Sequence, residues 1–149
     1  MADNKSSKKI RLRVLTPTAT KIDSEIDMAI LRAVDGEMGV LPDHATYLCA
    51  LADGVLRALD QGRERKIAVF GGVAEIRDNV LTVLTDEAHL PDEIDLDQTK
   101  EARERLEQEL QEHTDDKEIQ RAEILLRRML VKAEVGDSPR HSDFDETNS

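Results

Sequence analysis

Aromatic residues, cysteine and long apolar runs are all scarce in this chain of 149 residues. The aromatic residues are Tyr47, Phe70 and Phe144, so any hydrophobic core must be built from Val, Leu, Ile and Ala. Cys49 is the single cysteine, which excludes an intrachain disulfide and favours a reduced compartment. No run approaches the roughly 18 apolar residues that a membrane span needs, so we expect no direct membrane insertion.

An excess of positive charge is also missing, since the net charge is -11 and 36% of the residues are charged. Sequence-nonspecific nucleic-acid binding requires a basic face that neutralises phosphates, so we expect no nucleic-acid partner. Residues 1–8 are polar and are followed by no apolar segment of the kind found in signal peptides. We therefore expect a disordered N-terminus and no secretion signal.

Motifs that carry catalysis are absent. Gly71-Gly72 is not followed by Lys-Ser/Thr as in a phosphate-binding loop, and we interpret the pair as a tight strand crossing where only glycine fits. Cys49 lies in an apolar run and is expected to be an inert core residue. The histidines lack metal-ligand spacing; they are His44, His89, His113 and His141. We therefore expect neither an enzyme nor a metal site.

Two composition regimes meet near Pro91. Residues 9–90 are rich in Val, Leu, Ile and Gly and alternate with period two, whereas residues 92–133 contain no Gly or Pro and are rich in Glu, Arg, Leu and Ala. The first regime is typical of short strands and the second of helices. The predicted fold class is β + α: an N-terminal antiparallel β-sandwich or flattened barrel, followed by a C-terminal antiparallel two-helix hairpin.

Turn signals divide the first regime into eight or more strands. Residues 10–14 alternate apolar and basic, as expected of a half-buried strand. Residues 55–59 and 66–70 flank a predicted hairpin loop at 60–64. Asp78-Asn79 is a two-residue loop whose members tolerate positive φ, and it predicts a hairpin between 73–77 and 80–84.

The second regime predicts two helices joined by a turn at 113–117, a hairpin spanning 92–135. Asp95, with Gln98 three residues on, is the expected N-cap of a helix over 96–112, and Asp115 with Glu118 repeats that pattern. The apolar stripes are Ala102, Leu106 and Leu110 on the first helix, and Ile119, Ala122, Leu126, Met129 and Ala133 on the second. Residues 136–149 are polar and acidic and are expected to form a disordered tail.

Charge is segregated between the predicted helices. Residues 99–112 carry five glutamates, whereas residues 119–133 carry Glu123 alone against four cations, Arg121, Arg127, Arg128 and Lys132. We expect opposite charges to face one another across the hairpin, each exposed pair contributing only about 0–1 kcal/mol. Because the apolar stripes are thin and rich in alanine, the hairpin is expected to be marginal alone and able to detach.

Residues 35–44 read as a loop in which Gly36 and Gly39 precede Pro42 and His44. Farther on come Gly54-Val55-Leu56, Gly71-Gly72-Val73-Ala74-Glu75-Ile76 and Ile94-Asp95. In this order and spacing, residues from about 10 to 133 resemble the epsilon subunit of F-type ATP synthases. For a generic protein, His44 would be a loop histidine satisfied by the backbone.

The resemblance implies a non-catalytic subunit of the central stalk, which couples rotation of the proton-driven c-ring to the catalytic head. Its implied partners are the gamma subunit, the c-ring and, when the hairpin extends, the alpha and beta subunits. Its implied location is peripheral, on the cytoplasmic face of the bacterial cell membrane. By this resemblance His44 lies beside gamma and Glu37 on the loop that meets the c-ring, with Gly36, Gly39 and Pro42 shaping that loop.

The hairpin carries two further implications of the resemblance. Extended into the head, the basic face of Arg121, Arg127, Arg128 and Lys132 would meet an acidic segment and inhibit hydrolysis. Alternatively, this face pairs with the first helix. Some members bind ATP on the folded hairpin. Here Asp95 matches, and Arg105, Arg121 and Arg128 stand where matching arginines could, but Gln98 and Thr99 replace an arginine and an alanine. We therefore expect weak or absent ATP binding and no other cofactor. A nucleotide-sensing module and a stand-alone adaptor are the alternative functions.

Overall fold

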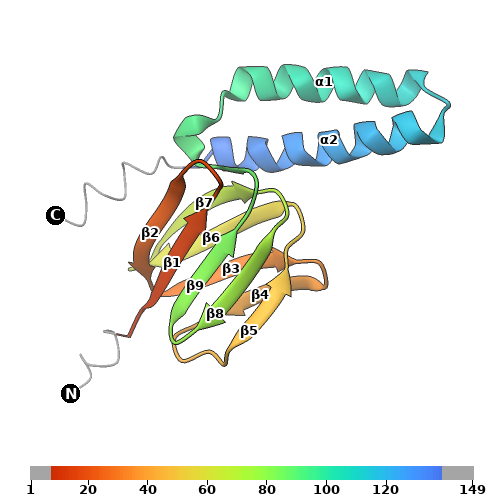
Figure 1. The fold of residues 1–149 in the computed structure, drawn as a ribbon. Helices are drawn as coiled ribbons and strands as arrows, with labels where there is room; N and C mark the ends of the chain where they lie inside the picture. The colour runs from red at the N-terminus through yellow and green to blue at the C-terminus, as the bar shows by residue number, and fades with distance from the viewer. Residues whose placement is uncertain (1–7, 139–149) are drawn as a thin grey trace.

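The computed structural model describes residues 8–138, which form a β-sandwich with a helical hairpin across one end (Figure 1). The predicted fold class is confirmed. The ten strands are β1 (Ile10–Leu15), β2 (Thr20–Ile26), β3 (Met28–Ala33), β4 (Gly36–Val40), β5 (Tyr47–Ala50), β6 (Gly54–Asp60), β7 (Arg63–Val69), β8 (Val73–Arg77), β9 (Val80–Leu84) and β10 (Ala88–His89).

The strands form two five-stranded sheets. Sheet A has the order β2-β1-β9-β8-β5, and sheet B has the order β10-β7-β6-β3-β4. Neighbouring strands are antiparallel except for β1 and β9, which pair in parallel from Arg11 opposite Val80 to Leu15 opposite Leu84. This pairing places the first strand inside sheet A, between β2 and β9.

Alternation along the strands builds the core between the sheets. The inward residues of β1 are fully buried, while Arg11 and Arg13 on the same strand face solvent, as the alternation predicted. Aliphatic side chains supply almost all of the core volume; its largest fully buried members are Ile10, Leu12, Ile26, Leu31, Leu56, Ile67, Ile76 and Leu81. Burying each such side chain contributes about 1.5–3 kcal/mol relative to leaving it exposed.

Two tight turns connect the central hairpins. Asp78 and Asn79 both have positive φ, at 49° and 63°, and join β8 to β9 as predicted. The predicted loop at 60–64 is wrong in extent, because Asp60 pairs with Arg63 and only Gln61 and Gly62 lie between the strands. The strands β6 and β7 therefore continue up to a two-residue turn.

Gly72 fills a position that no other residue fits. Its φ is 108°, and a Cβ atom there would lie 2.1 Å from the carbonyl oxygen of Leu84. The carbonyl of Gly72 itself accepts a hydrogen bond from the backbone N–H of Leu51 at 2.8 Å. The interpretation of Gly71-Gly72 as a close backbone crossing is confirmed.

The helices follow a short 3-10 turn, η2 (Pro91–Glu93). Helix α1 spans Leu96–Glu112, as predicted, and Oδ1 of its N-cap Asp95 accepts a hydrogen bond from the Gln98 backbone N–H at 3.1 Å. Helix α2 spans Asp116–Gly136, and its N-cap Asp115 accepts from the Lys117 backbone N–H. The helix thus includes Gly136, which was expected in the tail; residues 1–7 and 139–149 lie outside the described residues.

The segment 35–44 is not a continuous loop, so that prediction is wrong. Residues Gly36–Val40 form the edge strand β4, which pairs with β3 over five residues, from Ala33 opposite Gly36 to Ala29 opposite Val40. A turn at Pro42 and Asp43 and an irregular stretch to residue 46 remain, and they lead into β5. Strand pairing overrides the low β-propensity of the two glycines.

Candidate functional site

Helix α2 rests on the outer face of sheet B and separates α1 from the sandwich (Figure 1). The apolar contact is small: Ala68, Phe70 and Val135 are buried together, and Val55, Ile94 and Val131 pack around them. Only the C-terminal part of α2 contributes to this cluster. The tip of the hairpin projects past the sandwich (Figure 1).

Three ion pairs join α2 to the sandwich. Arg128 donates from Nε to Oδ2 of Asp53 at 2.9 Å, Nζ of Lys132 lies 3.7 Å from Oε2 of Glu87, and Nζ of Lys66 lies 3.3 Å from Oε2 of Glu134. Asp53 follows β5, and Glu87 precedes β10. Charged contacts therefore hold the helix on both sides of its small apolar contact.

The Phe70 ring lies at the centre of this interface and is 5% exposed. The guanidinium carbon of Arg128 lies 5.1 Å from the ring centroid, and Nζ of Lys132 lies 5.8 Å from it. The His89 ring is tilted at 58° with its centroid 5.9 Å away. Two cations over one buried aromatic face add cation–π attraction to the ion pairs.

Glu87 and His89 form a coupled pair beside this ring. Nε2 of His89 lies 2.7 Å from Oε2 of Glu87. Burial raises the pKa of Glu87, but the hydrogen bond to His89 and the charges of His89, Lys132 and Arg128 outweigh it, so the pKa is lowered overall. Glu87 is thus held ionised where it faces α2.

The charges do not pair across the hairpin as the sequence indicated. Within residues 8–138, no ion pair joins α1 to α2; Arg103 pairs with Glu107 on its own helix at 3.6 Å. Arg128 and Lys132 face the sandwich, while Arg127 lines a groove against sheet B and Arg121 is exposed. The cations of α2 therefore do not act together in this pose.

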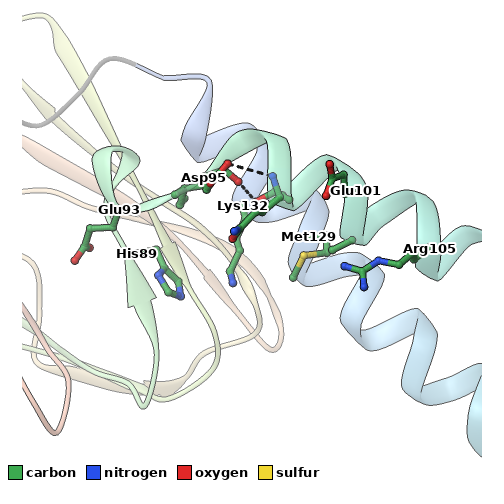
Figure 2. A pocket seen from close by; sticks show the side chains of 11 residues that line it. His89, Glu93, Asp95, Glu101, Arg105, Met129 and Lys132 are labelled. Carbon is green, nitrogen blue, oxygen red and sulfur yellow. Dashed lines mark hydrogen bonds between the residues drawn. The ribbon is translucent and has the colours of Figure 1, made fainter.

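A pocket of about 470 Å³ lies between η2, β10 and the two helices (Figure 2). Arg105 and Lys132 bring positive charge to it, whereas Glu93, Asp95 and Glu101 bring negative charge. Gln98 and Thr99 also line it, and their backbone N–H groups are occupied by Asp95, through its side chain and carbonyl respectively. Of the expected ATP-contacting residues, Asp95 and Arg105 meet here, but Arg128 is turned to Asp53.

The expected gamma and c-ring contacts lie on β4 and the segment after it. Gly36, with φ 132°, and Gly39 belong to β4, and Glu37 is exposed on that strand opposite Arg32. Pro42 lies in the following turn, and Nδ1 of the half-buried His44 lies 2.7 Å from the Ala45 carbonyl oxygen. Glu37 lines the groove between α2 and sheet B, whereas His44 is not among the residues of that groove.

The connection between β4 and β5 lies at the end of the sandwich farthest from the hairpin (Figure 1), and Asp43 anchors it there. Its backbone N–H donates to Oδ1 of Asn79 at 2.6 Å, and its carboxylate accepts from Nζ of Lys8 at 2.7 Å. The hydrogen bonds that the Asp43 carboxylate accepts from Nζ of Lys8 and from Nδ2 of Asn79 lower the pKa of Asp43. Asn79 precedes β9, and Glu87, which contacts α2, follows β9. The length of β9 therefore separates the segment around Asp43 from the contact with the hairpin.

Sequence reasoning missed an exposed apolar surface on the outer face of sheet A. Ala50 pairs with Val73, Val73 with Leu84 and Leu84 with Leu15, so the four side chains form one row across β5, β8, β9 and β1. Leu48 lies two residues from Ala50 on the same face and is 64% exposed; Leu84 is 49% exposed. We call Leu15, Leu48, Ala50, Val73 and Leu84 the apolar face. Such a surface is typical of a protein interface.

Within residues 8–138, no helix is long and apolar enough to cross a membrane. Nor do these residues contain a group of three or more His, Cys, Asp or Glu arranged to hold a metal ion. Cys49 is half-buried, lies 3.6 Å from the Met38 sulfur atom, and has its pKa raised by burial.

The sequence matches known proteins over most of its length. Residues 9–91 match the family model described as ATP synthase, Delta/Epsilon chain, beta-sandwich domain. An ATP synthase epsilon chain of Desulforamulus reducens is 35% identical over 127 residues, which cover 85% of this chain and 96% of the relative. The corresponding protein of Symbiobacterium thermophilum is 36% identical over 131 residues, or 87% and 94% of the two chains.

The fold matches solved structures as well. A chain in the Euglena gracilis mitochondrial ATP synthase (OSCP/F1/c-ring) aligns with a TM-score of 0.73 and 26% identity, covering 85% of this chain and 80% of that one. A chain of the Tetrahymena thermophila central stalk and c-ring has the same fold at a TM-score of 0.60 and 12% identity. The chain described here therefore belongs to the family of ATP synthase epsilon chains.

Proposed function

We propose that this chain is a non-catalytic rotor subunit of a proton-translocating ATP synthase, in which the apolar face of sheet A docks on the gamma subunit. The observation that carries the proposal is the row of Ala50, Val73, Leu84 and Leu15, because solvent-exposed apolar rows are costly unless a partner covers them. Family membership supplies the partner. The subunit is then peripheral at the cytoplasmic face of the bacterial cell membrane, held there by its partners.

The segment after β4 would complete the rotor contact. Pro42 and His44 lie close to β5, the strand that carries Leu48 and Ala50, so a partner covering the apolar face would also meet this segment. Glu37 is exposed on the edge strand β4 and is proposed to meet the c-ring, with Gly36 and Gly39 adding no side chains of their own to that edge. In this arrangement the sandwich couples ring rotation to gamma without chemistry of its own.

Reconstitution tests this role. An ATP synthase depleted of its epsilon subunit, in membrane vesicles, would receive the full chain, and ATP-driven proton pumping would be measured against ATP hydrolysis. We expect the chain to restore pumping per ATP hydrolysed. A chain that binds the complex but leaves this ratio unchanged would contradict the coupling role.

We further propose that the hairpin regulates hydrolysis by leaving the sandwich. In the docked pose Arg128 and Lys132 are engaged with Asp53, Glu87 and Phe70. Only an extended hairpin would bring Arg121, Arg127, Arg128 and Lys132 against an acidic segment of the alpha and beta subunits. The docked pose is then the uninhibited one.

Hydrolysis by the reconstituted complex tests the regulatory role. Replacing Arg127 and Arg128 by glutamine should relieve inhibition, since both charges would be lost from the extended hairpin. This loss should outweigh the easier opening that follows from breaking the Arg128–Asp53 pair. Glu123→Gln, which removes a charge of the opposite sign from the same helix, is the matched control and should retain inhibition. Equal hydrolysis with the wild-type chain and the double variant would count against this role.

Nucleotide sensing is the second candidate, favoured by the pocket between the helices (Figure 2). Its three carboxylates outnumber Arg105 and Lys132, and Arg128 is engaged elsewhere, so a triphosphate would meet net repulsion. We propose weak or absent ATP binding. Losing one cationic donor costs about 1–3 kcal/mol, or roughly ten- to a hundred-fold in affinity. Calorimetric titration with ATP tests this, and a micromolar dissociation constant would contradict it.

A further inference from the structure

A second groove, distinct from the pocket in Figure 2, lies where α2 leans over the outer face of sheet B. It measures about 550 Å³, within the range of small-molecule sites. Arg32 comes from β3, Arg57 from β6, Lys66 from β7 and Arg127 from α2. Val55 and Val131 give it an apolar part. Four cations from four elements therefore converge on one opening between the hairpin and the sandwich.

The carboxylates of the groove do not neutralise these cations fully. Asp53 is engaged by Arg128, which is outside the lining, and Glu134 by Lys66. Arg57 reaches its nearest carboxylate, Glu64, only at 4.0 Å. Glu37 is the third carboxylate of the groove, and it lies opposite Arg32 across the strand pair. Within residues 8–138, however, neither Arg32 nor Arg127 has a carboxylate oxygen within 4.0 Å. Two guanidinium groups thus remain available on opposite walls.

Gly54 explains how Arg32 is positioned. A Cβ atom built at Gly54 would lie 2.9 Å from Cδ and 3.0 Å from Cβ of Arg32. The aliphatic part of Arg32 therefore crosses the space that any other residue at position 54 would fill. The strand neighbour without a side chain lets this arginine lie along the floor of the groove.

We propose that this groove binds a small phosphate-type oxyanion between Arg32, Arg57 and Arg127. Guanidinium groups match phosphate oxygens in pairs, and three of them from different elements can surround one anion. The anion would also offset the repulsion between the cations of sheet B and Arg127 on α2. It would thereby stabilise the docked hairpin, an effect that goes beyond the proposed rotor function.

Amide NMR titration of the isolated full chain tests the proposal independently of any ATP synthase. The probes are inorganic phosphate and pyrophosphate, with sodium chloride at matched ionic strength as the control. We expect saturable shifts of the amides of Arg32, Gly54 and Val55 and of α2 near Arg127. Hydrogen exchange of α2 should slow as the site fills.

Matched variants locate the site. Arg32→Gln and Arg127→Gln should each weaken binding about ten-fold or more, as expected for one charged hydrogen-bonding group. Arg105→Gln, on the pocket of Figure 2, should bind as the wild type does. A titration with ATP in place of phosphate tests whether the groove recognises the phosphate group itself. Shifts near Arg127 with both probes support a phosphate subsite.

Three results would overturn the proposal. Sodium chloride could reproduce the shifts, both groove variants could bind phosphate with unchanged affinity, or the shifts could fall on residues 95–105 instead of the groove. Loss of rotor function in reconstitution would leave this result unaffected, because the titration uses the chain alone.

Discussion

Arg128 on α2 donates a hydrogen bond from Nε to the carboxylate of Asp53, 75 residues earlier in the chain, at 2.9 Å. The same guanidinium group lies 5.1 Å from the centroid of the Phe70 ring. One side chain thus links α2 to a loop and to the buried aromatic residue of the sandwich. A group in this position decides how firmly the hairpin stays docked.

Arg128→Gln should loosen α2 without unfolding the sandwich. An ion pair of this partial exposure contributes about 1 kcal/mol, so the open hairpin should become roughly five-fold more populated. Hydrogen exchange of α2 amides, followed by mass spectrometry, measures this. Arg121→Gln on the same helix is the control and should exchange like the wild type. Unaltered exchange in Arg128→Gln would show that the pair is not a restraint.

Phe70→Leu should separate the cation–π contribution from simple apolar packing. Leucine keeps most of the buried contact with Val135 but removes the ring faced by Arg128 and Lys132. We expect docking to weaken by about 0.5–2 kcal/mol, as for a cation–π contact. The same exchange experiment reports it, and the double variant with Arg128→Gln should lose less than the sum of the two single losses. Strict additivity would mean that the ring and the cation act independently.

Acid should release the hairpin through Glu87. Since the folded pKa of Glu87 is lowered from its ordinary value of 4.5, its stabilising effect is present above that value and is lost as the pH falls through the lowered pKa. Exchange of α2, corrected for intrinsic rates, should therefore rise below about pH 4.5. Glu87→Gln should already show looser docking at neutral pH and a smaller acid response. An identical pH dependence in both proteins would exclude Glu87 as the group responsible.

Gly72→Ala should damage the sandwich itself. The new methyl group would meet the Leu84 carbonyl oxygen at 2.1 Å with φ at 108°, so backbone must move. We expect a loss of more than about 3 kcal/mol, in the range produced by clashes with strained backbone. Gly62→Ala is the matched control, because Gly62 also has a positive φ, 77°, but no atom lies within 4 Å of the added Cβ position. It should reduce the free energy of unfolding by only about 1–2 kcal/mol. Thermal unfolding monitored by circular dichroism compares them, and equal melting temperatures would contradict the assignment.

The features that could be predicted from the sequence are those set by residues adjacent in the chain. Asp95 and the lack of Gly and Pro after it predicted α1 at its observed bounds, and Asp78-Asn79 predicted the β8–β9 turn. Both features depend on residues adjacent in the chain. Gly72 was interpretable for the same reason, because a glycine pair between apolar runs indicates a close backbone approach.

The features that could not be predicted from the sequence depend on contacts between residues distant in the chain. Gly36 and Gly39 lower the strand propensity of β4, so the sequence predicts a loop there, and only the pairing with β3 reveals the strand. The partners of Arg128 and Lys132 lie 75 and 45 positions away in the chain. The sequence instead suggested pairing with the glutamates of α1, because those residues are nearer in the chain. The apolar face depends on the register of the strands in sheet A, which the sequence does not show. Leu48 and Leu84, two leucines at outward-facing strand positions, were nevertheless a signal from which it could have been predicted.

The affinity of the chain for an epsilon-depleted ATP synthase head that contains gamma tests the central claim most directly. Leu48→Arg and Leu84→Arg would each place a charge on the apolar face, while Leu130→Arg, at a leucine 50% exposed on α2, is the matched control. The account predicts that both apolar-face variants bind at least about ten-fold more weakly, since burying an unpaired charge at an interface is costly. Leu130→Arg should bind like the wild type. Wild-type affinity in both Leu48→Arg and Leu84→Arg would contradict the account.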